Sequence, residues 1–248
     1  MKSKTLRFVS GAFVLASLCL SSSAAFGQGI FVYSNAFTRL NQYYAPGIAQ
    51  FGDEIILSGG AGQPMTSFQF EYVGLGLSGN ETVTLRFYKN DGALVIGGSI
   101  PAFKPNTKFY DSGPISLSVV NPPSGNTPSD GKTLRFTLPV GDPNMILPNN
   151  NFDFTWTVQF GGLENTGEVA GLDLYNPVNL GGNYNDFWQQ DPISSDWELR
   201  QDLSATPVPM NFGAVVSAVP EASPLQIGLL AGAVFLDWSI YRRRTATA

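Results

Sequence analysis

Apolar and polar residues alternate at every second position in several parts of the chain. The clearest run is NFDFTWTVQF, residues 151–160, which would place Phe152, Phe154, Trp156 and Val158 on one face. Successive side chains of a strand point to opposite faces, so this period predicts strands with one dry face and one wet face. The polar positions expected to face water are Asp153, Thr155, Thr157 and Gln159.

The same alternation recurs along the chain between turn signals. Strong candidates for strands are residues 67–73, 82–88, 115–120 and 133–138. Weaker candidates are residues 30–34, 54–58, 94–98, 108–112, 171–175 and 197–201. KNDGA, residues 89–93, is typical of a hairpin turn, because Asn and Gly accept a positive φ at low cost.

About ten strands and no candidate for a soluble helix predict an all-β fold, an antiparallel β-sandwich that is jelly-roll-like. We expect this domain to occupy residues 28–204. The segment ATPVPMNFGAVVS contains two prolines in its first half, and we interpret residues 205–218 as a linker.

Residues 1–27 have the three parts of a signal peptide. MKSKTLR is basic, residues 8–20 form an apolar run of 13 residues, and SSSAAFG is rich in small residues. We predict cleavage after Gly27, with cleavage after Ala25 as the alternative. The apolar run is too short to span a bilayer comfortably. The single cysteine, Cys19, lies in this leader, so the mature chain would have no thiol.

A second apolar run near the other end predicts a transmembrane helix. Residues 225–241 are apolar apart from Gln226, Asp237 and Ser239, and as a helix they would be about 25 Å long. Arg242, Arg243 and Arg244 follow directly. Positive charge stays on the cytoplasmic side, so residues 245–248 would be cytoplasmic and the body would face away from the cytoplasm. The alternative is a buried C-terminal helix.

This tail resembles the PEP-CTERM sorting signal of Gram-negative bacteria, which combines a Pro-Glu-Pro motif, a transmembrane helix and a basic terminus. The likeness covers residues 219–244: Val219, Pro220 and Glu221 match the motif, and Ala222 stands where the second Pro of the family usually lies. The resemblance implies a processing enzyme of the exosortase type as partner and co-occurrence with exopolysaccharide. A plain single-pass anchor stays open as the alternative. The body also resembles sandwich domains of undefined activity that carry such tails.

Composition excludes several classes of function. The chain has no histidine and the mature chain would have no cysteine, so catalytic Ser-His-Asp and Cys-His sites and the ordinary zinc ligand sets are excluded. Residues 28–221 contain 8 basic and 18 acidic groups, a net charge of −10, which repels the phosphates of nucleic acids. We expect no cofactor.

Carboxylate chemistry is what remains for an enzyme. Asp111-Ser112-Gly113 is similar to one loop of the aspartic proteases, but those enzymes need two such loops. We therefore expect a turn at a strand end, capped by Asp111. Glu164 and Glu168 lie in a Gly-rich segment where solvated acids are ordinary. A carboxylate-based hydrolase is thus the least favoured function.

The segment LGGNYNDFWQQDP, residues 180–192, is the best candidate for a ligand loop. Tyr184, Asp186 and Trp188 are the residues that would contact the ligand, with Tyr184, Phe187 and Trp188 as a platform for stacking on sugars. Oxygen ligands for calcium could come from Asn183, Asn185, Asp186 and Asp191. Because Phe187 and Trp188 are consecutive, we expect them instead to pack over the core in a closing turn.

These features predict an exported, non-enzymatic protein that is anchored in the cell-envelope membrane by its C-terminal helix or released to the extracellular matrix. The alternative is a module that binds exopolysaccharide.

Overall fold

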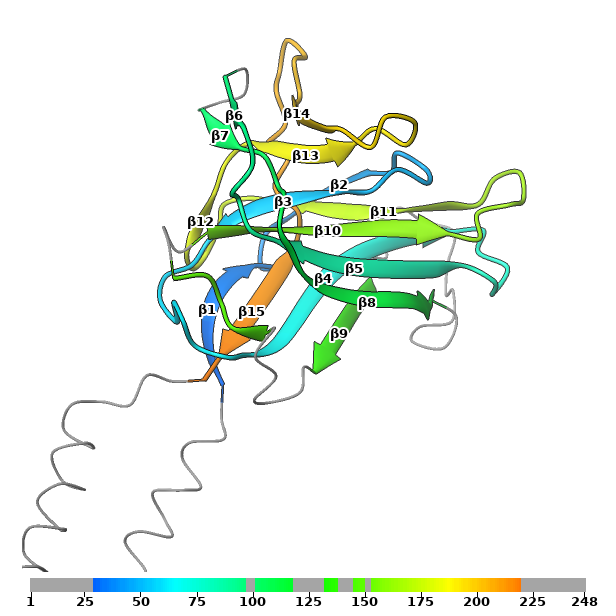
Figure 1. Ribbon diagram of the computed structural model, residues 1–248. Helices are drawn as coiled ribbons and strands as arrows, with labels where there is room; N and C mark the ends of the chain where they lie inside the picture. Colours follow the sequence, from blue (N-terminus) through cyan, green and yellow to red (C-terminus); the bar gives the residue numbers. More distant parts are fainter. Residues whose placement is uncertain (1–28, 97–100, 118–131, 138–144, 150–152, 220–248) are drawn as a thin grey trace, which may run out of the picture.

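The computed structural model of the protein describes residues 29–96, 101–117, 132–137, 145–149 and 153–219 (Figure 1). Two antiparallel sheets pack against each other, which confirms the predicted β-sandwich. The predicted signal peptide and the predicted transmembrane helix lie outside the described residues. Within the described ranges, no helix has the length and apolar character needed to cross a membrane.

The first sheet has six strands in the order β1-β15-β4-β11-β2, and β9 pairs with the other edge of β4. Its strands are β1 (Ile30–Asn35), β15 (Ala214–Ala218), β4 (Met65–Leu75), β11 (Val169–Tyr175), β2 (Arg39–Tyr44) and β9 (Lys132–Thr137). The strands β2 and β15 were not predicted from the sequence.

The second sheet has seven strands in the order β14-β13-β3-β10-β5-β8, and β12 pairs with β3. Its strands are β14 (Trp197–Gln201), β13 (Asp186–Gln190), β3 (Phe51–Ile56), β10 (Asp153–Gly161), β5 (Thr82–Tyr88), β8 (Lys108–Ser116) and β12 (Gly182–Asn183). A separate pair, β6 (Leu94–Val95) and β7 (Ala102–Phe103), lies between β5 and β8 in sequence.

The core lies between the two sheets and is rich in aromatic rings. Phe154, Trp156 and Val158 of β10 are fully buried, as predicted, while Phe152 lies outside the described residues. The Trp156 ring is 5.2 Å from Phe68 and 5.8 Å from Phe70 of the facing sheet, measured between centroids. Alternation in the sequence thus identified the inner face of the central strand.

The polar face of β10 is different from what alternation predicted. Thr155 and Thr157 are fully buried. The Thr155 hydroxyl donates to Asn90 Oδ1 at 2.7 Å, and Thr157 Oγ1 accepts from Gln50 Nε2 at 2.7 Å. The second sheet is therefore covered on its outer face as well as its inner face.

The cover is an extension of the β5–β8 hairpin, and KNDGA is not its turn. Lys89 N donates to Thr107 O, and Gly92 N donates to Lys104 O, so the two arms run on past residues 89–93 into β6 and β7. Neither Asn90 nor Gly92 has a positive φ. A second apolar cluster holds this hairpin to the sheet. It contains Tyr88, Ala102, Trp188 and Trp197, with Val95 and Leu199 at its margin.

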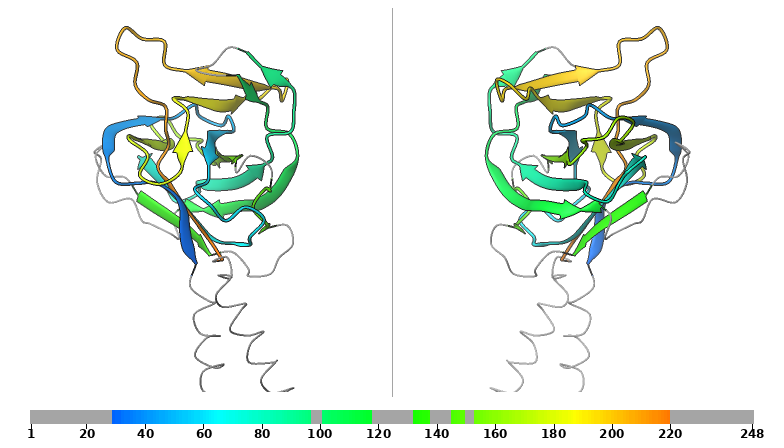
Figure 2. Two further views of the ribbon diagram at one scale, coloured as in Figure 1. Left: turned by 90° about the vertical axis from the view of Figure 1, so that its left-hand side faces the viewer. Right: turned by 90° about the vertical axis from the view of Figure 1, so that its right-hand side faces the viewer.

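The two ends of the described body leave it side by side. Ile30, the first residue of β1, pairs with Ala218, the last residue of β15. In two directions of view, the start of β1 and the end of β15 lie at the same end of the sandwich (Figures 1 and 2). The predicted linker over residues 205–218 is wrong for its second half, because β15 lies between β1 and β4 with buried Ala214, Val216 and Ala218. The apolar run AVVSA suits an inner strand, and the prolines before it obscured that signal.

Candidate functional site

The segment predicted to be a ligand loop is mostly strand. Residues 182–183 form β12 and residues 186–190 form β13, both paired with β3. Phe187 faces the main core, where its ring lies 4.7 Å from Tyr44 and 5.6 Å from Phe212. Trp188 faces the second cluster and has no exposed surface. The expectation that both rings are packed is confirmed. They are packed because both faces of strand β13 are covered, and not because of a closing turn.

The predicted sugar platform is therefore wrong at this position. A ring that stacks on a sugar must present a face to solvent, and Trp188 presents none. Tyr184 is half-buried beside an acidic group formed by Glu54, Asp153 and Asp186, and burial raises the pKa of its hydroxyl.

The oxygen atoms suggested for calcium do not converge. Asn183 Nδ2 donates to Asp53 and to Tyr33, and Asn185 Oδ1 accepts from Asn211. Asp191 caps its own turn by accepting from the backbone N–H groups of residues 193 and 194. Within the described ranges, no group of three or more His, Cys, Asp or Glu residues has the arrangement of a metal site.

The acidic group on the outer face of the second sheet follows from strand register. Glu54 of β3 lies beside Thr155 of β10, and Trp188 pairs with Gly52, which brings Asp186 to the other side of Glu54. Burial raises the pKa of Glu54 to about 7, and the carboxylates of Asp153 and Asp186 act in the same direction. Glu54 and Asp186 are buried, so the group is a poor candidate for catalysis on a substrate.

A buried carboxyl group also lies in the main core, and sequence reasoning missed it. Asp53 is fully buried, and burial raises its pKa well above the usual range. Its Oδ2 accepts from Asn183 Nδ2 at 3.1 Å and from the Phe212 N–H at 3.3 Å. The alternation of Phe51, Asp53 and Ile55 was the signal that could have placed it on the inner face. Its bonds tie β3 to β12 and to the segment before β15.

Asp111 lies inside β8, and the predicted turn at a strand end is wrong. Gly113 has a φ of 63°, and the β5–β8 pairing shifts its register here, so the Asp-Ser-Gly sequence forms a bulge. Burial would raise the pKa of Asp111, but hydrogen bonds from Lys108, Gly113 N–H and Arg86 outweigh it and lower the pKa to about 2. The residue thus serves an ion-pair network at the sheet edge.

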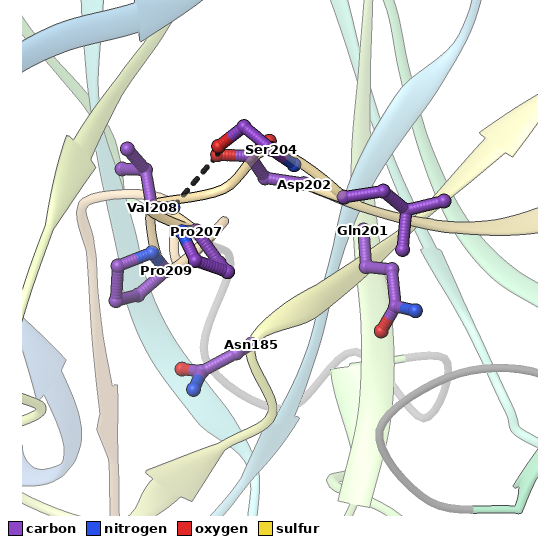
Figure 3. A pocket seen from close by; sticks show the side chains of 8 residues that line it. Asn185, Gln201, Asp202, Ser204, Pro207, Val208 and Pro209 are labelled. Carbon is purple, nitrogen blue, oxygen red and sulfur yellow. Dashed lines mark hydrogen bonds between the residues drawn. The ribbon is translucent and has the colours of Figure 1, made fainter.

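Among the described residues, two surface pockets are candidates for a ligand site. The larger, of about 390 Å³, lies between Asn185 and the segment that follows β14 (Figure 3). Its lining residues are Asn185, Gln201, Asp202, Leu203, Ser204, Pro207, Val208 and Pro209. We call it the β14 pocket. Its volume is within the range of small-molecule sites, about 300–1,000 Å³.

The smaller pocket, of about 330 Å³, lies between the base of the β6–β7 hairpin and the β13–β14 turn. We call it the hairpin pocket, and its lining includes Tyr88, Lys104, Gln190, Asp196 and Trp197. Tyr88 and Trp197 belong to the second cluster and keep only 8% and 9% of their surface exposed. With so little exposed surface, they offer no ring face on which a sugar could stack.

Comparison with known proteins gives no further assignment. No family model matches the chain, and no curated protein and no solved structure is significantly similar to it. The candidate sites therefore rest on geometry and chemistry alone.

Proposed function

We propose that the protein is an exported, non-enzymatic β-sandwich that is displayed at the cell surface or in the extracellular matrix. The PEP-CTERM-like tail would deliver it there, with an exosortase-type enzyme as its processing partner. The jelly-roll-like description of the body, the signal peptide and the transmembrane helix are parts of this proposal. The antiparallel sandwich is the part that the fold already supports.

The position of the last strand is the observation that carries the proposal. β15 ends at Ala218, and the Val219 N–H still donates to Pro64 O at 2.9 Å. The motif residues Val219, Pro220 and Glu221 therefore begin where the sheet ends. A cut near Glu221 would leave every described strand in place, whereas a cut before Ala214 would remove a strand from the middle of the first sheet.

The paired ends support display of the body from one point. β1 and β15 are neighbours, so the first residue of β1 and the last residue of β15 lie at the same end of the sandwich (Figure 1). The segment 202–209 stands at the opposite end in both directions of view (Figures 1 and 2). A body held at the first end would thus present its far end to the surroundings.

Mass spectrometry of the C-terminus of the protein from its native host tests this proposal. We expect a chain that ends near Glu221, in the envelope or the extracellular fraction. A Pro220→Ala, Glu221→Ala double variant should stay full length, and an exposed Glu164→Ala control should be processed normally. Full-length wild-type protein in the cytosol would refute the proposed export. An intact terminus in the membrane would support a permanent anchor and refute processing.

A second candidate function is binding of carbohydrate, without catalysis. The specific observation in its favour is the β14 pocket, which lies at the end of the sandwich away from the paired ends. The platform of Tyr184 and Trp188 that first suggested this function is not part of it.

A further inference from the structure

The wall of the β14 pocket is held in shape by one carboxylate. Asp202 Oδ1 accepts from the Ser204 N–H at 2.9 Å. Its Oδ2 accepts from the Ser204 hydroxyl at 3.0 Å and from the Val208 N–H at 2.7 Å. Figure 3 shows Asp202 and Ser204 on one side of the opening and Asn185 on the other. Pro207 and Pro209 restrict the same segment further, so the pocket exists before any ligand binds.

The hydrogen-bonding capacity of two other polar lining residues, Gln201 and Asn185, is largely unused. Among the described residues, the Gln201 amide and Asn185 Nδ2 have no hydrogen-bond partner in the protein, whereas Asn185 Oδ1 accepts from Asn211. A primary amide offers two donors and one acceptor oxygen. These groups lie at the margin of a preformed hollow where a bound molecule can reach them.

The charge of the lining selects the class of ligand. None of the eight lining residues is cationic, and the one carboxylate, Asp202, already accepts three hydrogen bonds. The body as a whole is acidic, so an anionic ligand is disfavoured. Hydroxyl groups both donate and accept hydrogen bonds, as do primary amides, so a ligand rich in hydroxyl groups suits the unused amide groups of the lining. The apolar surfaces of Pro207, Val208 and Pro209 can pack against C–H groups.

From this combination we infer that the β14 pocket binds one neutral sugar unit of a saccharide chain, with the Gln201 amide and Asn185 Nδ2 as its hydrogen-bonding groups. The inference rests on the second candidate function above and gives it a site and a ligand class.

The hairpin pocket fits a neutral sugar less well. Its polar groups are largely occupied, since Gln190 Nε2 donates to Ser195 O and the Tyr88 hydroxyl accepts from Gln50. Its remaining groups include the charged side chains of Lys104 and Asp196, which water solvates strongly. This pocket therefore provides a matched control.

The test is isothermal titration calorimetry of the full-length chain with neutral hexoses and their di- to tetrasaccharides. The detergent must carry no sugar head group. We expect binding of at least one neutral saccharide and weaker binding of the corresponding uronic acid. Gln201→Ala should weaken binding about tenfold, the effect of losing one good hydrogen-bonding group. Gln201→Trp, which fills the hollow, should abolish it, and Gln190→Ala should leave it unchanged.

Each result decides for or against the site. The inference would be overturned if no neutral saccharide binds. It would also be overturned if Gln190→Ala loses binding while Gln201→Trp retains it. The melting temperature of each variant must match that of the wild type for its result to count. If Gln201→Ala unfolds, Asn185→Ala gives the same comparison from the opposite wall. Cell fractionation of Gln201→Ala separates this inference from the proposed export, because its location should not change.

Discussion

Both faces of β3, β10 and β13 in the seven-stranded sheet are largely buried, but the two faces are covered in different ways. The inner face meets the other sheet, and the core there draws residues from strands distant in the chain. The outer face is covered in large part by one hairpin extension, described over residues 89–96 and 101–107, which packs on a much smaller apolar cluster. A side chain on the inner face is held by the whole sandwich. A side chain on the outer face is held by a local element that can open without global unfolding.

The largest effect is expected from Trp156→Ala on the inner face. Trp156 is fully buried, and its ring lies within 6.4 Å of Phe68, Phe70 and Phe212. The change removes a large apolar group and leaves a cavity that two packed sheets cannot close. We expect a loss of about 3–5 kcal/mol in the free energy of unfolding, measured by denaturant titration.

Trp156→Phe is the matched control. Trp156 Nε1 has no hydrogen-bond partner among the described residues, so the change forfeits no polar contact. Its cost should be clearly smaller than that of the alanine variant. An unchanged stability of Trp156→Ala would mean that the inner face is not the principal core.

Trp188→Ala tests the outer face. Trp188 is as fully buried as Trp156, but the hairpin above it can settle into the space left behind. We expect a loss of about 2–3 kcal/mol, since the cost of a cavity depends on how far the site can collapse. Amide hydrogen exchange should quicken mainly in residues 89–107. Equal quickening throughout the sandwich would contradict the proposed difference between the two covers.

The same difference explains which parts of the fold the sequence could predict. Strict alternation identifies a face that is apolar, so Phe154, Trp156 and Val158 were placed correctly. Alternation cannot distinguish a polar face exposed to solvent from a polar face buried beneath a hairpin. Thr155 and Thr157 would alternate with apolar residues in either case, and they are buried. Their hydrogen-bond partners are distant in the chain, Asn90 for Thr155 and Gln50 for Thr157, and such contacts are a tertiary feature.

The candidate site was less predictable than the fold. Asn185 was named for its oxygen, but it lines the β14 pocket beside Gln201 only because β13 and β14 pair and the chain then curls around Asp202. No local pattern encodes that hollow. Trp188 drew attention as an aromatic residue next to Asn and Asp, and local composition does not reveal that β3 and the hairpin enclose it.

The smallest effect is expected from the acidic group beneath the outer cover. The pKa of Glu54 is raised to about 7, chiefly by burial, whereas a Glu side chain in the unfolded chain has a pKa near 4.5. Between these values the folded protein keeps a proton that the unfolded chain releases. The contribution of Glu54 to stability is therefore most favourable below about pH 4.5 and falls as the pH rises toward 7. Burial raises the pKa of Asp53 and of Asp173 as well, so both act in the same direction.

Glu54→Gln should remove the part of this slope that comes from Glu54. The glutamine keeps the shape of the side chain and carries no charge at any pH, so the variant should be more stable than the wild type at pH 8, by on the order of 1–2 kcal/mol, and similar to it at pH 4.5. Denaturant titrations at the two pH values measure the difference, with exposed Glu164→Gln as the control. A wild type that gains stability from pH 4.5 to 8, or a slope that Glu54→Gln leaves untouched, would show that this carboxyl group is not held protonated. The hairpin would then cover an ionised group, and opening of the hairpin would expose the Glu54 carboxylate to water. Amide hydrogen exchange in residues 89–107, measured at both pH values, would detect this opening.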